Sequence, residues 1–365
     1  MKTIYFLVEW QNDKKKTWSG TCWGLYSALQ KYLKVQDLDI HESYFCRIIR
    51  KIFKIDSQLG LRNIKIKRKN VIRHLRRDKN AIVFQFAEVI KDTENINTYL
   101  YIDVDVNYVK HLHDNELEIF NLSNFSSADI FSINIRNESQ LAYLANCRGV
   151  FTMGNWLKNS LIERLNISPD RVHHVGGGVN LNITKIKDKI KGNNKILFVG
   201  RDFERKGGFL VLEAFKILKN IKKDAELHIA GPATCPFDYN IDGVFYYGDC
   251  DHENIEELMN LCDIFCMPSY FEAYGLVFIE ALAFGLPCIG RNAYEMPFFI
   301  ENEKTGLLID NDDPSDLATK MNTLLKDLSY KERVRSRRDW YISNYSWDSV
   351  ANKIYSTIQK DSLNK

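Results

Sequence analysis

Two glutamates, Glu272 and Glu280, lie in the stretch PSYFEAYGLVFIEALAFGLPCIG (residues 268–290) with seven residues between them. The apolar run at 263–267, which precedes this stretch, predicts a buried parallel strand. Residues 276–284 have the apolar spacing of a helix, and a glycine and a proline follow them as stop signals. Glu272 is therefore expected on a loop at the carboxyl end of a strand, and Glu280 about one turn into the next helix.

A loop that leads into a helix suits a phosphate group, because the first turn has unpaired N–H groups and a partial positive charge. One carboxylate on each side of such an anion site could hydrogen-bond the two sugars of a nucleoside diphosphate-sugar. The alternative is that both glutamates are solvated surface residues whose spacing arose by chance. The predicted strand–loop–helix context favours the binding site.

A pair of cations follows another predicted strand. Residues 195–200 (KILFVG) indicate a buried strand, and the loop RDFERKGG places Arg201 and Lys206 just past its end. Two cations in this position could clamp a diphosphate through charge-assisted hydrogen bonds. The loop is not a Walker motif, because it lacks the pattern GxxxxGK[ST].

Apolar runs alternate with helical patterns along both halves of the chain, which predicts an α/β fold with parallel sheets wrapped on both faces. The length of 365 residues favours two domains. Gly176, Gly177 and Gly178 predict a flexible boundary between them, followed by a polar linker at 180–194. In the first half, strands are expected at 3–10, 38–45, 81–87, 98–104, 129–133, 149–153 and 171–175, with helices at 21–32, 137–145 and 155–165. In the second half, strands are expected at 195–200, 226–231, 244–247, 263–267, 287–290 and 306–309, with a helix at 209–220 and a mostly helical tail.

The composition is that of an ordinary soluble globular chain, with 45% hydrophobic residues, 27% charged residues and a net charge of +3. No apolar run reaches the ~18–20 residues of a membrane-spanning helix, and the short apolar start indicates a strand rather than a signal peptide. The eight cysteines are scattered and form no CxxC pair, so reduced thiols in a cytoplasmic protein are expected.

The segment 47–77 is strongly basic, because it contains twelve lysines and arginines and a single acid, Asp56, with apolar residues interleaved. This basic amphipathic pattern predicts contact with an anionic membrane surface or with an anionic acceptor. A solvated face is the main alternative. Nucleic acid is a third option and is not expected as a partner.

Several polar residues of the first half fall at predicted strand ends, where ligands bind in open parallel sheets. Gly20 precedes a helix and would allow a ligand close to the backbone, with a plain turn as the alternative. Asp103 and Asp105 could orient an acceptor hydroxyl or cap the following helix. His111 and His113 would point to different faces of a helix, so no metal site is expected there.

The second half resembles the donor domain of family 4 retaining glycosyltransferases, the glycosyl transferases group 1, which have the GT-B architecture. The resemblance is carried between residues 195 and 325, in the order of the family, by FVGRDFERKGG, LHIAGP, FYYGDCDHENIEEL, EAYGLVFIE, EALAFGLPCIG and EKTGLLID, and the ending YSWDSVANKIY also fits. The first half matches less closely, through Gly20 and VFTMGNWLKNSLIERLNISPDRVHHVGGGVN. Residues 42–129 carry no motif of the family.

The resemblance implies two doubly wound Rossmann-like domains that face a central cleft. The N-terminal domain, residues 1–178, would bind the acceptor, and the C-terminal domain, residues 179–345, would bind the nucleotide-sugar donor. The C-terminal helix, at about 346–361, would pack back on the first domain.

The resemblance also assigns roles to residues. Arg201 and Lys206 would contact the diphosphate and stabilise the departing charge, Glu280 would bind the ribose, and Glu272 would contact the transferred sugar. The other donor contacts would come from Gly20, Gly200, Gly231, Pro232, Gly248, Asp249, Cys250, Tyr274, Gly275 and Leu276. Many members carry a histidine at a strand end of the first domain, and its absence here leaves Asp103 as the catalytic candidate on the acceptor side, with Glu88 and Asp105 as further candidates.

The implied activity is that of a retaining, metal-independent hexosyltransferase. It would move a sugar from a UDP- or GDP-linked donor to a saccharide or lipid-linked acceptor, in cell-surface polysaccharide or glycan assembly. No cofactor would be needed, since the two cations take the place of a metal. The protein would be cytoplasmic, with peripheral attachment to the inner face of the membrane as an option. The alternatives are a sugar-nucleotide epimerase or phosphorylase on the same fold, or an inactive nucleotide-sugar-binding subunit.

Overall fold

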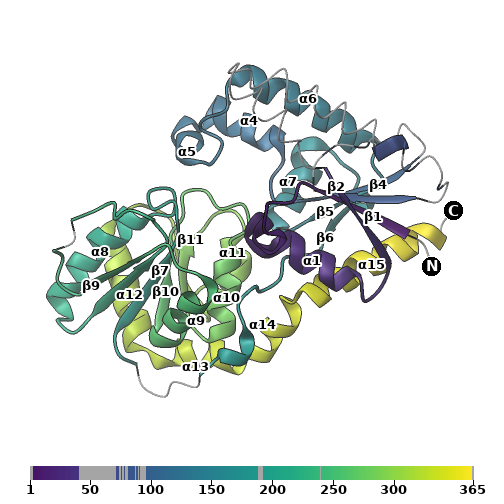
Figure 1. Ribbon diagram of the computed structural model, residues 1–365. Coiled ribbons are helices and arrows are strands. Elements are labelled where there is room, and N and C mark those ends of the chain that lie inside the picture. Colours follow the sequence, from purple (N-terminus) through teal and green to yellow (C-terminus); the bar gives the residue numbers. More distant parts are fainter. Residues whose placement is uncertain are drawn as a thin grey trace. The chain divides into compact units, whose positions relative to one another are not determined.

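The computed structural model describes residues 3–40, 71–73, 75, 78, 81–86, 88, 90, 96–187, 192–238 and 240–363. The chain divides into two compact units (Figure 1). The first comprises Met1–Phe120, Ser127–Gly178 and Trp347–Lys365, and the second comprises Asn121–Ser126 and Val179–Ser346. Most of the basic segment 47–77 lies outside the described residues, and so do the expectations that rest on it.

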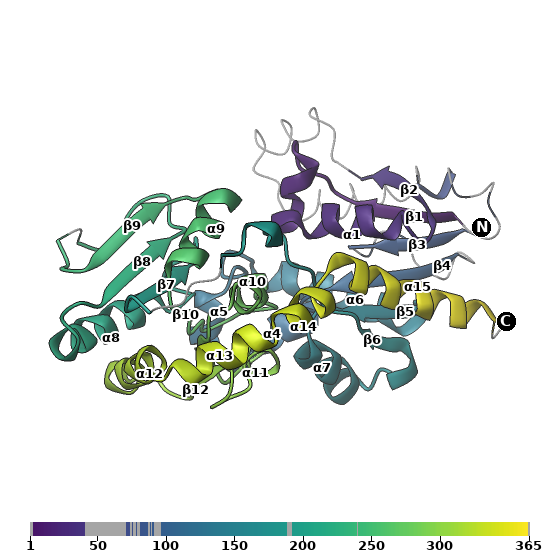
Figure 2. The ribbon, with the colours of Figure 1, turned by 90° about the horizontal axis from the view of Figure 1, so that it is seen from below.

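The first unit is built on six parallel strands in the order β2-β1-β3-β4-β5-β6 (Figures 1 and 2). The strands are β1 (Thr3–Val8), β2 (Lys34–Asp39), β3 (Ile82–Gln85), β4 (Asn97–Ile102), β5 (Gly149–Thr152) and β6 (Val172–His174). The described part of this unit has the helices η1 (Lys14–Gly20), α1 (Thr21–Leu29), α4 (Val106–Asn115), α5 (Leu117–Leu122, whose last two residues belong to the second unit), α6 (Ile130–Asn146), α7 (Asn155–Leu165), η3 (Pro169–Arg171) and α15 (Trp347–Leu363). The central strands are almost wholly buried, as continuous apolar runs predict.

The second unit has six parallel strands in the order β12-β11-β10-β7-β8-β9. The strands are β7 (Lys195–Val199), β8 (Glu226–Ala230), β9 (Val244–Gly248), β10 (Ile264–Cys266), β11 (Cys288–Arg291) and β12 (Gly306–Ile309). Its helices are η4 (Ile183–Lys185), α8 (Gly208–Ile221), α9 (His252–Leu261), α10 (Leu276–Phe284), α11 (Met296–Phe299), α12 (Pro314–Lys326), α13 (Leu328–Ser336) and α14 (Arg338–Asn344). The predicted architecture of two doubly wound parallel sheets is confirmed, and every predicted strand of this half is present.

The strand predicted at 129–133 is wrong, because this segment opens a helix. Asp129 caps α6, and its side chain accepts a hydrogen bond from the Ser132 N–H at 2.9 Å. The Ile133 N–H donates to the Asp129 carbonyl at 3.0 Å. A run of five residues is too short for apolar periodicity to separate a strand from a helix, and here the capping aspartate decides. The strand predicted at 38–45 overlaps only the end of β2, which begins at Lys34 and ends at Asp39, and residues 41–45 lie outside the described residues.

The two units divide directly after Gly178, where the boundary was expected, but the glycines there are closely packed. All three glycines are buried. The Gly176 carbonyl accepts a hydrogen bond from the Tyr101 hydroxyl at 2.8 Å. A Cβ at Gly178 would lie 2.6 Å from the backbone nitrogen of Trp347, where the chain enters the first unit again. Close packing, and not mobility, therefore requires small residues here.

The C-terminal helix α15 packs within the first unit, beside α1. A Cβ at Gly24 would lie 2.4 Å from the indole nitrogen of Trp347, so the glycine makes room for this ring. The Tyr32 and Tyr355 rings stack with centroids 5.6 Å apart. Helices α1 and α15, from opposite ends of the chain, thus pack side by side in the same unit (Figure 2).

Candidate active site

The loops that follow β7 and β10 meet at one edge of the second sheet. The two strands are parallel neighbours, so their carboxyl ends lie side by side. The loop after β7 carries Arg201, Arg205 and Lys206, and the loop after β10 carries Glu272. A hydrogen bond of 2.9 Å from the Tyr270 N–H to the Arg205 carbonyl joins the loops. Segments that are far apart in the sequence therefore build a single site.

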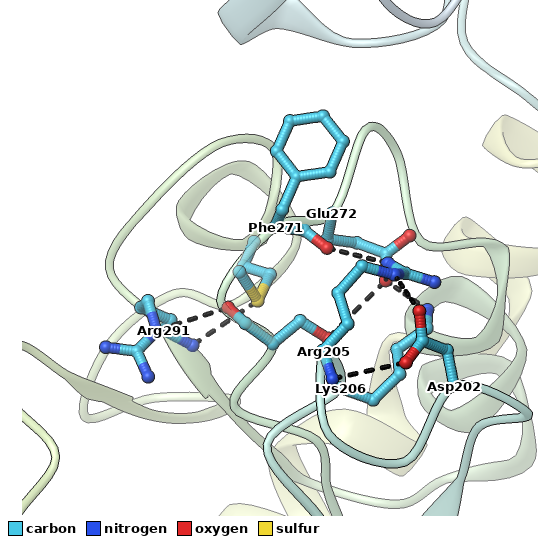
Figure 3. A network of polar contacts seen from close by, with 8 residues as sticks. Asp202, Arg205, Lys206, Phe271, Glu272 and Arg291 are labelled. Atoms are coloured by element: carbon cyan, nitrogen blue, oxygen red, sulfur yellow. Dashed lines mark hydrogen bonds and ion pairs between the residues drawn. The ribbon is translucent and has the colours of Figure 1, made fainter. Parts of the chain in front are cut away.

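At this edge Lys206 and Glu272 form an ion pair that is largely shielded from solvent (Figure 3). Lys206 Nζ donates to Glu272 Oε2, and the two side chains are 13% and 11% exposed. Burial lowers the pKa of the Lys206 ammonium from its usual value, while the Glu272 carboxylate acts in the opposite direction. Gly200 leaves room for the lysine, because a Cβ there would lie 2.8 Å from Lys206 Cγ. The structure thus brings two predicted site residues into direct contact.

Arg205 is a residue of this site that the sequence analysis missed. It is 8% exposed, and its Nε donates to Asp202 Oδ2 at 2.9 Å. Its Nη1 donates to the Phe271 carbonyl at 2.7 Å and lies 3.8 Å from Glu272 Oε2 (Figure 3). The guanidinium therefore fastens the loop of Glu272 to the loop after β7. The sequence shows only that RDFERKGG has a further cation, and its partner is far away along the chain.

Arg291, the last residue of β11, fixes the same loop and was also missed. Its Nε donates to the Ser269 carbonyl at 3.1 Å, and its Nη2 donates to Asp312 Oδ1 at 2.6 Å. The guanidinium lies 4.6 Å from the centre of the Tyr270 ring. Two arginines, one on the loop after β7 and one at the end of β11, thus hold the main chain that presents Glu272, which favours a preorganised carboxylate.

Arg201 differs from Lys206 in its surroundings, although the sequence predicts the same role for both. Its side chain is 77% exposed, and its Nε donates to Asp249 Oδ1 at 3.1 Å. A surface ion pair of this kind contributes about 1 kcal/mol or less. Its predicted contact with a diphosphate stays a prediction.

Two helices begin at the same edge, each directly after a glycine. Gly207 precedes α8, and its φ of +76° and the 2.6 Å that would separate a Cβ from the Pro268 carbonyl oxygen both require glycine. Gly275 precedes α10, which opens at Leu276. The N-terminal N–H groups of two helices of this length suit an anion beside Lys206. The Tyr274 ring packs against Phe299, with centroids 5.0 Å apart, and the predicted contact of Tyr274 with the donor stays a prediction.

The residues expected to border the base lie at the ends of β8 and β9, at the same edge of the sheet. The Gly231 N–H donates to the Gly248 carbonyl at 2.8 Å. The Pro232 carbonyl accepts a hydrogen bond from the Tyr246 hydroxyl. Cys250 is half-buried, and this burial raises the pKa of its thiol. Their contact with a base stays a prediction.

Glu280 lies on α10, as predicted, but it has a structural partner. Its carboxylate is 8% exposed and accepts a hydrogen bond from the Asn180 N–H at 3.1 Å. Glu256 on α9 accepts one from the Asn182 N–H at 2.7 Å. The two carboxylates thus fix the segment that opens the second unit. Burial raises the pKa of Glu280 to about 7, against the effect of its backbone hydrogen bonds. The ribose role of Glu280 stays a prediction.

The raised pKa of Glu280 predicts a pH-dependent stability. The folded-state pKa of about 7 lies above the ordinary value of 4.5, so between these values the folded protein binds more protons than the unfolded chain. Stability from this group is present below pH ~4.5 and is lost as the pH rises through ~7, by about 3 kcal/mol in total. Glu280→Gln should remove this loss, so urea unfolding should find the variant more stable than wild type at pH 8 and not at pH 5. Glu257→Gln, at an exposed position of α9, is the control and should leave the pH profile unchanged.

In the first unit, Gly20 ends a turn of unusual backbone geometry after β1. Trp18, Ser19 and Gly20 all have positive φ, at 49°, 52° and 92°. For Trp18 and Ser19 this conformation costs energy, and such strain gathers at ligand sites. The Trp18 side chain is 41% exposed and packs edge-on against Phe86, with centroids 5.3 Å apart. A donor contact by Gly20 stays a prediction.

The three acceptor-side candidates have different surroundings in the first unit. Asp105 is fully buried, caps α4 and accepts hydrogen bonds from Arg164 Nη2 at 3.0 and 2.8 Å. The capping role predicted for it is therefore confirmed. Asp103 is half-buried directly after β4. Glu88 accepts a hydrogen bond from Gln140 Nε2. A catalytic role stays a prediction for Asp103 and Glu88.

His111 and His113 lie on α4 and each faces a nearby carboxylate. His111 Nε2 is 3.2 Å from Glu116 Oε1, and His113 Nδ1 is 2.9 Å from Asp114 Oδ1. Among the residues that the structure describes, no group of three or more His, Cys, Asp or Glu side chains could hold a metal ion. Within the same residues, no helix combines the length and apolar composition needed to cross a bilayer.

Comparison with known proteins places this site in context. Residues 180–340 match the family model of glycosyl transferases group 1. A D-inositol 3-phosphate glycosyltransferase of Corynebacterium kroppenstedtii is 29% identical over 185 residues, which are 47% of this chain and 41% of that protein. The chain spans 52% of the length of two further relatives with the same name.

Solved structures extend the likeness of the fold to the whole chain. A sucrose-phosphate synthase of Thermosynechococcus elongatus has a TM-score of 0.70 at 15% identity, with both chains covered completely. The Anabaena protein HepE, solved with UDP and glucose, has a TM-score of 0.66 at 13% identity, covering 98% of this chain and all of that one. Residues 180–340 are therefore similar to glycosyl transferases group 1, and the chain as a whole has the GT-B fold.

Proposed function

We propose that the protein is a retaining glycosyltransferase that moves a sugar from a nucleoside diphosphate-sugar to a saccharide or lipid-linked acceptor. The observation that carries the proposal is the shielded Lys206–Glu272 pair beside the first turns of α8 and α10. A cation and helix N-termini suit a diphosphate, and a fixed carboxylate suits the hydroxyls of the sugar.

The chemistry follows from where charge develops. The acceptor hydroxyl attacks the anomeric carbon while the bond from this carbon to the phosphate oxygen breaks. Negative charge grows on the departing diphosphate, where Lys206 and the helix N-termini stabilise it. The departing phosphate takes the acceptor proton, so the products are a glycoside and a nucleoside diphosphate. Attack on the face that the leaving group vacates retains the anomeric configuration, and the step uses no metal.

The donor is proposed to carry UDP or GDP, and the Anabaena structure with UDP and glucose supports the first of these. Glu280 would bind the ribose by accepting hydrogen bonds from its hydroxyls in addition to the one from the Asn180 N–H. Asp103 or Glu88 would orient the acceptor hydroxyl. Three further parts of the proposal rest on the sequence alone. They are an acceptor in cell-surface glycan assembly, a cytoplasmic location, and attachment to an anionic membrane through residues 47–77.

A panel of radiolabelled UDP- and GDP-sugars tests the proposal. The full chain should hydrolyse one donor slowly without acceptor, and should transfer its sugar when saccharide or lipid-linked acceptors are added. Tight binding of a nucleotide sugar without any turnover would favour an inactive binding subunit. Conversion of the donor to an epimeric sugar, or phosphate-dependent turnover, would favour an epimerase or a phosphorylase.

A further inference from the structure

The carboxylate of Glu272 lies between two cations from consecutive residues. Lys206 Nζ donates to Glu272 Oε2, and Arg205 Nη1 lies 3.8 Å from the same oxygen. The Ser269 hydroxyl lies 3.5 Å from this oxygen as well. The three charged side chains are all close to nine-tenths buried, at 9% exposed for Arg205, 13% for Lys206 and 11% for Glu272. A carboxylate in such surroundings requires a counter-ion.

The two cations differ in how firmly they are held. The Arg205 guanidinium is fixed by Asp202 at 2.9 Å and by the Phe271 carbonyl at 2.7 Å. Its backbone is fixed too, because the Arg205 carbonyl accepts from the Tyr270 N–H and its N–H donates to Asp202 at 3.3 Å. The ammonium of Lys206 stands at the end of a flexible four-carbon stem, so it can turn without moving the backbone.

When a donor binds, two anions compete for the Lys206 ammonium: the diphosphate and the Glu272 carboxylate. The diphosphate needs the ammonium, and Glu272 needs a counter-ion at all times. A buried carboxylate that lost its last cation would be strongly disfavoured. The structure places Arg205 where it can remain beside Glu272 when Lys206 leaves (Figure 3).

We propose that Arg205 is a positioning residue that serves as the counter-ion of Glu272 while Lys206 turns to the diphosphate of the donor. The inference rests on the proposed function and deepens it, because it says how one lysine can serve two anions in turn. Arg205 touches neither sugar nor phosphate in this scheme. By remaining beside the Glu272 carboxylate, Arg205 lowers the electrostatic cost of moving Lys206 away from it.

A double-mutant cycle with nucleotides tests the exchange. Arg205→Met removes one of the two cations beside Glu272 and makes the carboxylate depend on Lys206, so affinity for the nucleoside diphosphate should fall about tenfold. Glu272→Gln removes the competing charge, so affinity for the diphosphate should rise. In the Glu272→Gln background, Arg205→Met should change affinity less than twofold. Isothermal titration of the full chain with UDP, UMP, GDP and GMP measures all four proteins, and the monophosphates should respond much less than the diphosphates.

Several outcomes would overturn the inference while leaving the proposed function intact. One is that Arg205→Met lowers the affinity for the diphosphate equally in the wild-type and Glu272→Gln backgrounds. Another is that it lowers the affinity for diphosphate and monophosphate equally. A third is weaker diphosphate binding by Glu272→Gln alone, which does not depend on whether Arg205→Met folds. Arg205→Lys is the rescue variant, since it keeps the charge and loses the fork that holds Phe271, and it should recover part of the affinity. If wild type binds no nucleoside diphosphate at all, the proposed function fails and the inference fails with it.

Discussion

Replacing Lys206 by alanine is expected to lower the turnover of the nucleotide sugar by about 10²–10³-fold, or about 3–4 kcal/mol of transition-state stabilisation. Lys206 is a cation in a shielded site, where an electrostatic contact is stronger than in water. Its contact with the diphosphate strengthens as the bond to the sugar breaks, so kcat should fall more than KM changes. Steady-state kinetics with the donor identified by the radiolabelled panel measures both constants.

Arg201→Ala is the control for this prediction. The Arg201 side chain is 77% exposed and pairs with Asp249, so solvent screens its charge. Its removal should cost about tenfold or less in turnover. Near-normal turnover by Lys206→Ala would show that the lysine does not stabilise the leaving group. Equal losses from both variants would contradict the distinction between a shielded and an exposed cation.

Gly231→Ala is expected to destabilise the fold strongly, with a loss of about 3 kcal/mol or more in the free energy of unfolding. Gly231 has a φ of +134°, which L side chains rarely adopt. A Cβ there would lie 2.3 Å from the carbonyl carbon of Gly200, so backbone would meet backbone where the ends of β7 and β8 approach. Neither strand can move without disturbing the loop that carries Lys206. Urea unfolding of the full chain should show a clearly lowered midpoint for the second unit.

Gly248→Ala provides a matched control, because Gly248 accepts the hydrogen bond of Gly231 and also has a positive φ, of +70°. A Cβ at this position would make ordinary van der Waals contacts, the nearest at 3.9 Å. Only the backbone strain of about 1 kcal/mol should remain. If the two variants unfold at the same urea concentration, the clash of a Cβ at residue 231 with the Gly200 backbone is not the cause of the lost stability.

The second unit could be predicted from the sequence because its signals are local. Buried parallel strands are short continuous apolar runs, and the loops after them contain the glycines and charges that mark a site. The helix at 276–284 and the placement of Glu272 before it are confirmed by α10. The segment at 129–133 failed because so short an apolar run fits both kinds of element, and only the cap at Asp129 separates them.

What the sequence could not show is which charges meet. Arg205 finds the Phe271 carbonyl, and Arg291 finds the Ser269 carbonyl, only because β7, β10 and β11 are neighbours in the sheet. The sequence also could not show why a given glycine is needed. At Gly178 a side chain would clash with the backbone of Trp347, a residue near the other end of the chain. Contacts of this kind depend on which distant segments become neighbours in the fold, and no local sequence pattern shows that.

The measurement that tests sugar transfer from a diphosphate most directly is the anomeric configuration of the first product. Time-resolved proton NMR should follow the full chain with the UDP- or GDP-sugar that it consumes, with Lys206→Ala alongside. Same-face attack predicts that the sugar first appears with the anomeric configuration of the donor, and that Lys206→Ala forms it about 10²–10³-fold more slowly. A first product with the opposite configuration, or a complete failure to release sugar from any UDP- or GDP-sugar, would contradict the proposed reaction.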